Sequence, residues 1–238
     1  MFNDPPGVIP SLDVDINEAI RIAENIKDLK QEIAGLKIGS VLAWRYGLPK
    51  IIGKIKDACD FPIIFDAQKA GNDIPDIVER QVKFIADIGI DAFIASPHGA
   101  GSETLDSFVK TCFEFDVIPI IVIEMTQPLS GIFLSGNASE LIFKQALGLD
   151  VENFIAPANK VGRIEYYKDI SIKLDKKIKI FSPGVGPQGG EAESAVKAGA
   201  DFVIIGRSIY QAADPREAVV QAHNLMKKAI KNMPCESV

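Results

Sequence analysis

Two carboxylates flank one lysine in the segment Phe65-Asp66-Ala67-Gln68-Lys69-Ala70-Gly71-Asn72-Asp73-Ile74-Pro75. The apolar run just before these charges, Pro62 to Phe65, is typical of a short buried strand, so the charges lie where a strand opens into a loop. Two like charges held beside an ammonium group cost free energy unless the fold fixes them in place. Such an acid–base–acid group can deliver a proton and repel a substrate anion, and the alternative is a solvated turn with a chance ion pair.

Short apolar runs alternate with longer amphipathic segments along the whole chain. The predicted strands are Val8–Leu12, Gly35–Ile38, Pro62–Phe65, Ala92–Ala95, Ile118–Ile123, Asn153–Ala156, Ile178–Phe181 and Phe202–Ile205. The predicted helices are Asn17–Leu29, Leu48–Ala58, Ile74–Ile88, Ser102–Phe115, Ser139–Leu149, Val161–Ile170, Gly190–Ala198 and Asp214–Lys231. The strands are apolar on both faces, as parallel strands covered by helices must be. Such repeated units without a linker favour one α/β domain over residues 1–238, a closed (β/α)₈ TIM barrel, with 232–238 as a flexible tail.

An open doubly wound sheet is the alternative fold. Such a sheet usually carries a Gly-x-Gly-x-x-Gly motif after its first strand. This chain has Asp13-Val14-Asp15 at that point. The closed barrel is therefore the favoured architecture.

Polar side chains follow the carboxyl ends of the predicted strands, which is the edge where barrel enzymes build their active sites. The residues at these ends are Asp13, Lys37, Asp66 with Lys69, His98, Glu124 to Thr126, Pro157, Ser182 with Pro183, and Gly206 with Arg207. We expect these side chains to share one site, because the strand ends of a barrel meet at the same rim.

A glycine-rich segment, Ser182 to Gly190, follows the seventh predicted strand, and Gly206-Arg207-Ser208 follows the eighth. Glycines let backbone N–H groups approach an anion closely, and barrels often bind phosphate between these two loops. Arg207 adds a fork of donors that suits phosphate oxygens. A flexible loop beside an ordinary arginine is the alternative, but the two positions together favour a phosphate site.

Three other features allow more than one interpretation. His98 can be a general acid, although a hydrogen-bonded structural histidine is the favoured interpretation. Glu124 can be a carboxylate held by Lys37 or Lys69, or it can bind Mg²⁺ together with Asp66. Trp44-Arg45-Tyr46 is typical of a packing cluster at the start of a helix, and we expect no catalytic role for it.

The bulk composition narrows the class of protein. The chain has 238 residues, 47% of them hydrophobic, and a formal net charge of −6, which argues against a nucleic-acid partner. The amino-terminal residues lack the pattern of a signal peptide, and no apolar run is long enough to span a membrane. Cys59, Cys112 and Cys235 are scattered without metal-binding spacing, which fits a reducing cytoplasm. We therefore expect a cytoplasmic enzyme without a metal.

These segments resemble the orotidine 5′-phosphate decarboxylase family, particularly its archaeal branch, over nearly the whole chain. The motifs that carry the resemblance are Ser11-Leu12-Asp13-Val14, Gly35-Leu36-Lys37-Ile38-Gly39, the Asp66/Lys69/Asp73-Ile74-Pro75 cluster, Glu124-Met125-Thr126-Gln127-Pro128, Ser182 to Gly190, Gly206-Arg207-Ser208-Ile209-Tyr210 and Asp214-Pro215. The resemblance implies decarboxylation of orotidine 5′-phosphate to UMP without a cofactor, as the last step of pyrimidine biosynthesis.

The resemblance also implies a role for individual residues. Lys69 stabilises a carbanion at C6 and then protonates it, within a charged network formed with Lys37, Asp66 and Asp73. Asp73 and Ile74 reach the site of a neighbouring subunit, which makes the protein a homodimer. The implied substrate-binding residues are Asp13 at the ribose hydroxyls, Ile74, Thr126 at the pyrimidine, Pro183, and Gln188, Gly206 and Arg207 at the phosphate.

One spacing departs from the family pattern. The family has Asp-x-Lys-x-x-Asp, whereas this chain has Asp66-x-x-Lys69-x-x-x-Asp73, and Gly71 can absorb an added residue in a bulge. Two alternatives therefore stay open. One is a magnesium-dependent enzyme of the keto-gulonate phosphate decarboxylase or hexulose phosphate synthase type, and the other is a nucleotide-binding barrel without catalytic activity.

Overall fold

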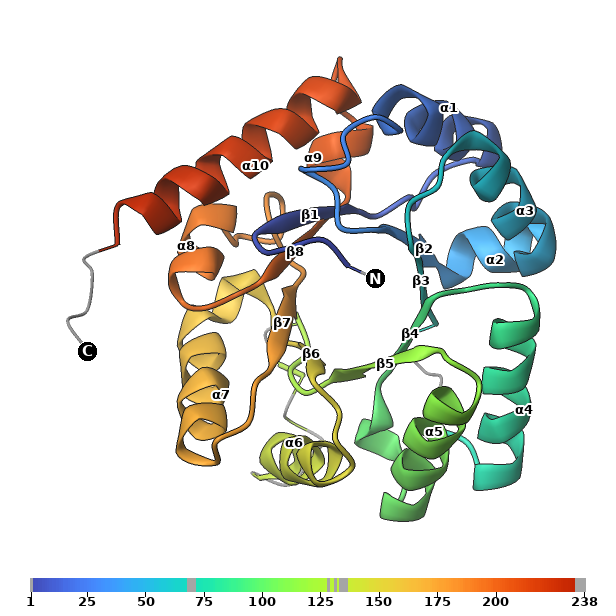
Figure 1. Ribbon diagram of the computed structural model, residues 1–238, viewed down its shortest axis with the longest axis vertical. Helices are drawn as coiled ribbons and strands as arrows, with labels where there is room; N and C mark the ends of the chain where they lie inside the picture. The colour runs from blue at the N-terminus through green and yellow to red at the C-terminus, as the bar shows by residue number, and fades with distance from the viewer. Residues whose placement is uncertain (1, 68–71, 128, 131, 133–136, 234–238) are drawn as a thin grey trace.

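Eight parallel strands form a barrel with helices around its outside (Figure 1). The computed structural model describes residues 2–67, 72–127, 129–130, 132 and 137–233. The strands are β1 (Gly7–Pro10), β2 (Leu36–Gly39), β3 (Ile63–Asp66), β4 (Ala92–Ala95), β5 (Ile118–Val122), β6 (Asn153–Ile155), β7 (Lys179–Ser182) and β8 (Phe202–Ile205). The predicted (β/α)₈ barrel is therefore confirmed.

The helices also follow the predicted pattern, with two additions. They are α1 (Ile16–Ile26), α2 (Ser40–Tyr46), α3 (Leu48–Ala58), α4 (Pro75–Asp87), α5 (Ser102–Glu114), α6 (Ala138–Gly148), α7 (Val161–Lys173), α8 (Ala192–Lys197), α9 (Arg207–Tyr210) and α10 (Pro215–Lys231), with 3₁₀ turns η1 (Pro97–Gly99) and η2 (Ala158–Lys160). The sequence analysis missed α2 and α9, because both are short and follow a strand end directly.

The barrel closes between its first two strands. The strand order is β1-β8-β7-β6-β5-β4-β3-β2, and each neighbouring pair in this order is parallel. At the remaining seam, Ala34 N donates to Val8 O at 3.0 Å, and Leu12 N donates to Lys37 O at 2.9 Å. These bonds bring the end of β1 beside the middle of β2.

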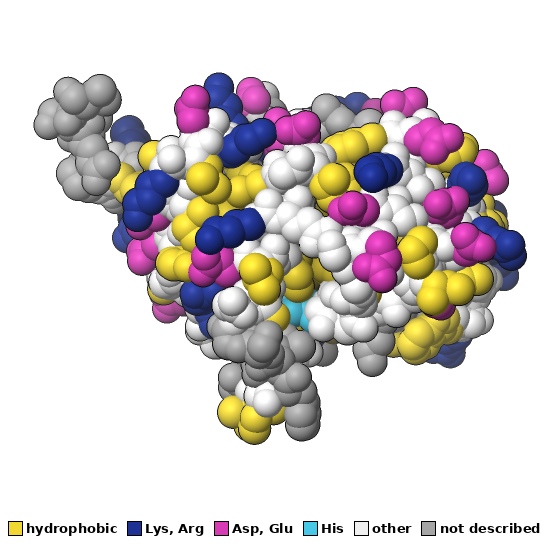
Figure 2. Space-filling view, turned by 90° about the horizontal axis from the view of Figure 1, so that it is seen from below, with side chains coloured by type: hydrophobic (Ala, Val, Ile, Leu, Met, Phe, Trp, Pro, Cys, Tyr) yellow, Lys and Arg dark blue, Asp and Glu magenta, His cyan; other side chains and the backbone are white. Residues whose placement is uncertain are grey.

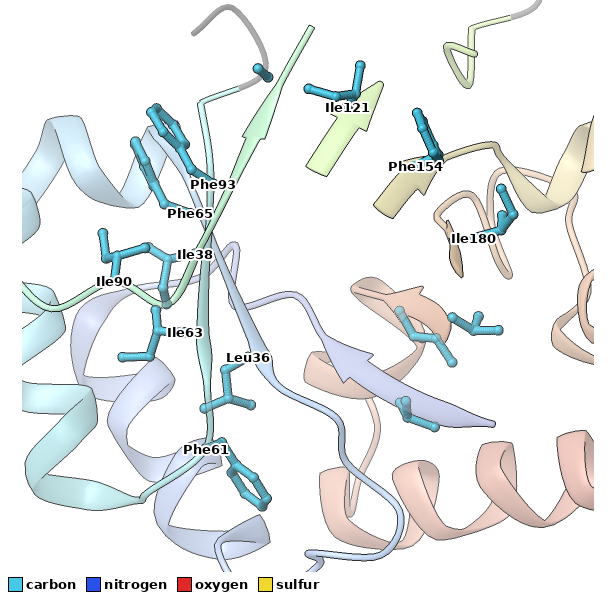
Figure 3. Packing of buried hydrophobic residues seen from close by; sticks show 14 of the residues in the cluster. Leu36, Ile38, Phe61, Ile63, Phe65, Ile90, Phe93, Ile121, Phe154 and Ile180 are labelled. Carbon is cyan, nitrogen blue, oxygen red and sulfur yellow. The ribbon is translucent and has the colours of Figure 1, made fainter. Parts of the chain in front are cut away.

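Two apolar layers hold the barrel together. Ile9, Ile64, Phe181 and Phe202 belong to the layer inside the barrel, and the Phe2 ring packs on both phenylalanines. The second layer lies between the strands and the helices, and its members are spread along the strands in Figure 3. Large side chains therefore fill the interior of the barrel.

The alternation of side chains along a strand decides which residues point into the barrel. In β3, Ile63 and Phe65 belong to the outer layer, while Ile64 belongs to the inner one. Because successive side chains point to opposite faces, Asp66 follows Ile64 to the inside. In β2 the same argument applies to Lys37, which lies between the outer residues Leu36 and Ile38. Two charged side chains are thus directed into the carboxyl end of the barrel.

The surface carries both signs of charge. Lys and Arg side chains are intermingled with Asp and Glu over the face in Figure 2. Among the described helices, none is both long and apolar enough to cross a membrane. Helix α10 ends at Lys231, and most of the tail predicted from residue 232 lies outside the described residues.

We expect Phe202→Ala to lower the free energy of unfolding by about 3–5 kcal/mol, because it leaves a cavity in the inner layer. Phe202 is fully buried, and its ring centroid lies 4.8 Å from that of Phe181. Urea unfolding measures the change. The matched control is Ile172→Ala, whose side chain is 74% exposed and which should change stability by less than about 0.5 kcal/mol. Equal effects of the two substitutions would contradict this packing.

Candidate active site

A cavity of about 220 Å³ opens at the carboxyl ends of the strands. Its lining residues are Ser11, Asp13, Lys37, Asp66, Thr126, Pro183, Gly184, Val185, Gln188, Ile204, Gly206, Arg207 and Tyr210. Eight of the residues that the sequence analysis assigned to the site line this cavity: Asp13, Lys37, Asp66, Thr126, Pro183, Gln188, Gly206 and Arg207. They come from six of the eight βα units, so only the closed barrel brings them together.

One side of the cavity is a buried ion pair. Lys37 Nζ lies 2.9 Å from Asp66 Oδ2 and 3.8 Å from Asp13 Oδ2. Lys37 and Asp66 are each only 8% exposed, whereas Asp13 is exposed. The pairing follows from strand register, because Gly39 of β2 lies opposite Asp66 of β3 and a lysine side chain can extend two residues along the strand. Glycine at position 39 leaves room for the Asp13 carboxylate, since a Cβ there would overlap Asp13 Oδ1.

The two carboxylates keep Lys37 protonated. Burial by itself lowers the pKa of Lys37, but the charges of Asp66 and Asp13 outweigh this effect and raise the pKa above the usual 10.5. A pKa that is higher in the folded protein stabilises it below the unfolded pKa, and this contribution is lost as the pH rises through the folded pKa. The ion pair therefore persists at neutral pH and weakens only in alkali.

Glycine-rich backbone forms the opposite side of the cavity. Between β7 and α8 the chain folds back on itself, with Gly190 N donating to Gly184 O at 3.0 Å and Gly186 N donating to Gly190 O at 2.9 Å. Gly186 has a φ of +80°, and a Cβ at this position would overlap the Ser208 hydroxyl. The loop after β7 can therefore lie against the start of α9 only with glycine there. Gln188, Gly206 and Arg207 reach the cavity from these two segments.

Two residues that the sequence analysis missed connect the loops around the cavity. Asn159 Nδ2 donates to Thr126 O at 3.1 Å and to Gln188 O at 3.4 Å. Lys160 Nζ donates to Met125 O at 2.7 Å and contacts the Ser130 hydroxyl at 3.2 Å. Because both residues bind backbone rather than charged partners, no sequence motif marks them. Asn159 therefore ties the loop after β5 to the loop after β7, and Lys160 ties η2 to the loop after β5.

Asp73 and Ile74 lie outside this cavity, at the start of α4. Asp73 Oδ1 accepts from the backbone of Ile74 at 2.8 Å, and its carbonyl accepts from the Thr104 hydroxyl at 2.9 Å. Both residues are exposed. They are held in place against α5 but are not directed into the site of their own chain.

Lys69, the predicted proton donor, lies outside the described residues, as does Gly71, the predicted position of a bulge. The described residues on each side of this gap, 67 and 72, follow β3 and precede α4. The catalytic role of Lys69 therefore stays a prediction.

The structure gives Glu124 a partner other than those predicted. Arg163 Nε donates to Glu124 Oε1 at 2.6 Å, and the Tyr167 hydroxyl donates to the same oxygen at 3.1 Å. Glu124 is not among the residues that line the cavity with Asp66. The predicted pairing of Glu124 with Lys37 is therefore wrong, because an arginine on α7 holds it instead. The described residues also contain no cluster of three or more ligands suited to a metal ion.

His98 is partly buried in η1, where its Nδ1 lies 3.2 Å from the Ser96 hydroxyl. Burial lowers the pKa of His98 below its usual 6.5, although the nearby charge of Glu124 opposes this change. His98 is not among the residues that line the cavity, which agrees with a hydrogen-bonded structural role.

The fold and the cavity define a TIM-barrel protein of the class that places a charged cluster and a glycine-rich anion loop at one rim. Residues 6–222 match the model of the Orotidine 5′-phosphate decarboxylase / HUMPS family. The chain belongs to this family. This finding confirms the resemblance inferred from the sequence motifs.

Curated relatives support the decarboxylase branch of the family. A protein of Pyrococcus abyssi is 36% identical over 220 residues, which are 91% of this chain and 97% of that protein. A protein of Thermococcus kodakarensis is 37% identical over 213 residues, which are 89% of this chain and 92% of that protein. Both relatives are named orotidine 5′-phosphate decarboxylase.

Solved structures show the same fold. The decarboxylase of Pyrococcus horikoshii has a TM-score of 0.78 and 32% identity, covering 92% of this chain and 99% of its own. The decarboxylase of Methanocaldococcus jannaschii, crystallised with the inhibitor BMP, has a TM-score of 0.81 and 27% identity, covering 95% of this chain and 99% of its own.

We expect Lys37→Met to lower the free energy of unfolding by about 3 kcal/mol at neutral pH, because it removes the cation from a buried ion pair. Lys30→Met is the matched control, since Lys30 Nζ also lies close to a carboxylate, 2.6 Å from Asp60, but both groups are exposed. The control should cost less than about 1 kcal/mol. Urea unfolding of the two variants measures the difference, and similar costs would mean that the buried pair does not stabilise the barrel.

Proposed function

We propose that this protein decarboxylates orotidine 5′-phosphate to UMP, the last step of pyrimidine biosynthesis. The observation that carries the proposal is the cavity itself, which places the Lys37–Asp66 pair on one side and Gln188, Gly206 and Arg207 on the other. A nucleotide has its reacting base at one end and its phosphate at the other. The names of the archaeal relatives point to the same substrate.

The proposed chemistry is a redox-neutral bond cleavage. The bond between C6 and the substrate carboxylate breaks, its electron pair stays on C6, and CO₂ leaves. The ammonium of Lys69 then gives a proton to C6 and forms UMP. Because electrons are neither gained nor lost, the reaction needs no oxidant or reductant, and we infer that the enzyme works without a cofactor.

Asp66 and Lys69 act in opposite directions on the substrate and the transition state. The Asp66 carboxylate, fixed by Lys37 at 2.9 Å, repels the substrate carboxylate, and this repulsion disappears as CO₂ becomes neutral. Lys69 attracts the negative charge that accumulates on C6. Both effects favour the transition state over the bound substrate, which is how a site lowers a reaction barrier.

The remaining cavity residues bind parts of the substrate that do not react. Asp13 and Lys37 contact the ribose hydroxyls, Thr126 contacts the pyrimidine, and Gln188 and Arg207 bind the phosphate together with the backbone of the glycine-rich loop. Binding energy from the remote phosphate can hold the base against Asp66 despite the repulsion between the carboxylates. The link through Asn159 supports this proposal, because it joins the loop of Thr126 to the loop of Gln188.

We further infer that two copies of the chain pair across the face formed by α2, α3 and α4. A mostly apolar groove of about 440 Å³ on this face is lined by Trp44, Leu48, Phe84 and Gln81, among others. Trp44 is 82% exposed and lies in the last turn of α2 (Ser40–Tyr46), so the predicted packing of this residue at a helix start is wrong for the single chain. In the groove, the buried Gln81 Oε1 has no hydrogen-bond partner among the described residues. An exposed apolar patch beside an unsatisfied polar atom is typical of an interface.

The position of this face relative to the active site supports a second copy as its occupant. A further hollow of about 350 Å³ is lined by Asp13, Lys37 and Asp66 at one end and by Val41 and Trp44 at the other. It runs from the charged cluster toward the apolar groove, which shares Trp44 and Ala67 with it. In the proposed homodimer, Asp73 and Ile74 of the second copy enter this hollow and complete the site.

We also infer a cytoplasmic location. Cys59 and Cys112 are both buried free thiols, which fits a reducing compartment.

We expect the purified protein to remove the ultraviolet absorbance of orotidine 5′-phosphate at the same rate with and without EDTA. Lys69→Ala should lower kcat by at least about a thousandfold, because it removes both the counter-charge and the proton donor. UMP binding by this variant, measured by calorimetry, serves as its control for folding. Loss of activity in EDTA would support the magnesium-dependent alternative, and UMP binding without turnover by the wild type would support the non-catalytic barrel.

We expect inactive variants to complement one another if Asp73 acts across the dimer. A mixed dimer of Lys69→Ala and Asp73→Asn chains has one site in which both residues are intact. Random exchange of subunits should therefore restore up to roughly one quarter of the wild-type activity. The matched control is a mixture of Lys69→Ala with Asp66→Asn, which both lie in the same chain's site and should give no recovery. Recovery in neither mixture would contradict the shared site.

A further inference from the structure

Ser11 lies directly beside Asp13 in the active-site cavity, although the sequence analysis gave it no role. Its hydroxyl donates to Asp13 Oδ2 at 2.6 Å. Ser11 is only 5% exposed, and it lines the cavity together with Asp13. A short hydrogen bond from a neutral hydroxyl to a carboxylate is one of the stronger kinds in proteins.

Backbone bonds on both sides hold Ser11 in place. The Ser11 N–H donates to Ile205 O at 2.8 Å, at the end of β8. On the opposite side, Ser11 forms a parallel β-bridge with Lys37 of β2. A Cβ on Gly206 would lie 3.7 Å from that of Ser11. The hydroxyl is therefore fixed by the barrel frame and does not depend on a mobile side chain for its position.

Asp13 itself has few other constraints. It is exposed, and Lys37 Nζ lies 3.8 Å from its carboxylate, whereas the same ammonium lies 2.9 Å from Asp66. The ion pair with Lys37 is thus directed mainly to Asp66. The Ser11 hydroxyl is the closest polar contact that the structure records for Asp13, and a Cβ on Gly39 would overlap the other carboxylate oxygen.

We propose that Ser11 is a positioning residue that fixes the carboxylate of Asp13 for the two ribose hydroxyls of the ligand. This inference rests on the proposed function, because it takes a ribonucleotide as the ligand. With Oδ2 occupied by Ser11, rotation of the carboxylate toward Lys37 or water would break the hydrogen bond. The remaining acceptor positions of Asp13 therefore stay directed to the cavity. The Ser11–Asp13 pair then favours a ribose over a sugar without hydroxyls.

The test measures binding of UMP and of 2′,3′-dideoxy-UMP by calorimetry. We expect Ser11→Ala to weaken UMP binding about tenfold, the size expected for a hydrogen bond to a charged group, and to change dideoxy-UMP binding by less than about twofold. In an Asp13→Ala background, Ser11→Ala should have no further effect on UMP. Ser11→Thr keeps the hydroxyl and should restore UMP binding, whereas Ser11→Cys keeps the size with a weaker donor and should not.

Ser171→Ala is the matched control for stability. Ser171 is also buried, but its hydroxyl donates to Lys168 O at 2.8 Å on α7, away from the cavity. This variant should bind both ligands as the wild type does. If Ser11→Ala binds UMP normally, or weakens both ligands equally, the inference is wrong while the proposed function stands. If the wild type binds no UMP, the proposed function fails and the inference fails with it.

Discussion

The buried ammonium of Lys37 is the interaction on which the active site depends. A buried carboxylate such as Asp66 needs a cation beside it at the mouth of an apolar barrel, because burial penalises its charge. Lys37 supplies this cation at 2.9 Å from Asp66 and 3.8 Å from Asp13. Its pKa is raised by these partners, so the charge is permanent at neutral pH. Lys37 therefore fixes the buried Asp66 side chain at the rim of the cavity, where the proposed reaction needs it.

The strands of the barrel hold the charged residues of this cluster at fixed positions relative to one another. Each charged residue of the cluster comes from or directly follows a strand, and parallel pairing sets their relative height. The groups assigned to phosphate binding follow β7 and β8 instead, in the glycine-rich loop of Gln188 and at the start of α9, where backbone can approach an anion. Asn159 joins the loop of Gln188 to the loop of Thr126 through backbone oxygens, and Lys160 binds the backbone of Met125 in the latter loop. In the proposed reaction, the fixed charges would act on the reacting end of the substrate, while binding energy from the phosphate end would offset the repulsion there.

The proposed homodimer would account for the exposed apolar side chains on the face beside the cavity. Trp44 and Phe84 line the same groove and are exposed, and Ile74 is exposed at the start of α4. In a homodimer this surface would be covered, and Asp73 would reach the charged cluster of the neighbouring copy. The active site and the dimer would then depend on each other, because the same contact that buries the apolar face would bring in the last charged group.

The sequence by itself determined the barrel and most of its rim, because strand periodicity and strand ends are local properties that each segment carries alone. Asp13, Lys37 and Asp66 could be assigned to one rim without knowing their distances. Only the tertiary structure decided which side chains contact one another. Glu124 binds Arg163 of α7 rather than Lys37, and Ser11 holds Asp13, because such contacts depend on how helices pack and on which way a side chain turns after its strand ends. Asn159 escaped detection for the same reason, since its partners are backbone atoms that become neighbours only when the barrel closes.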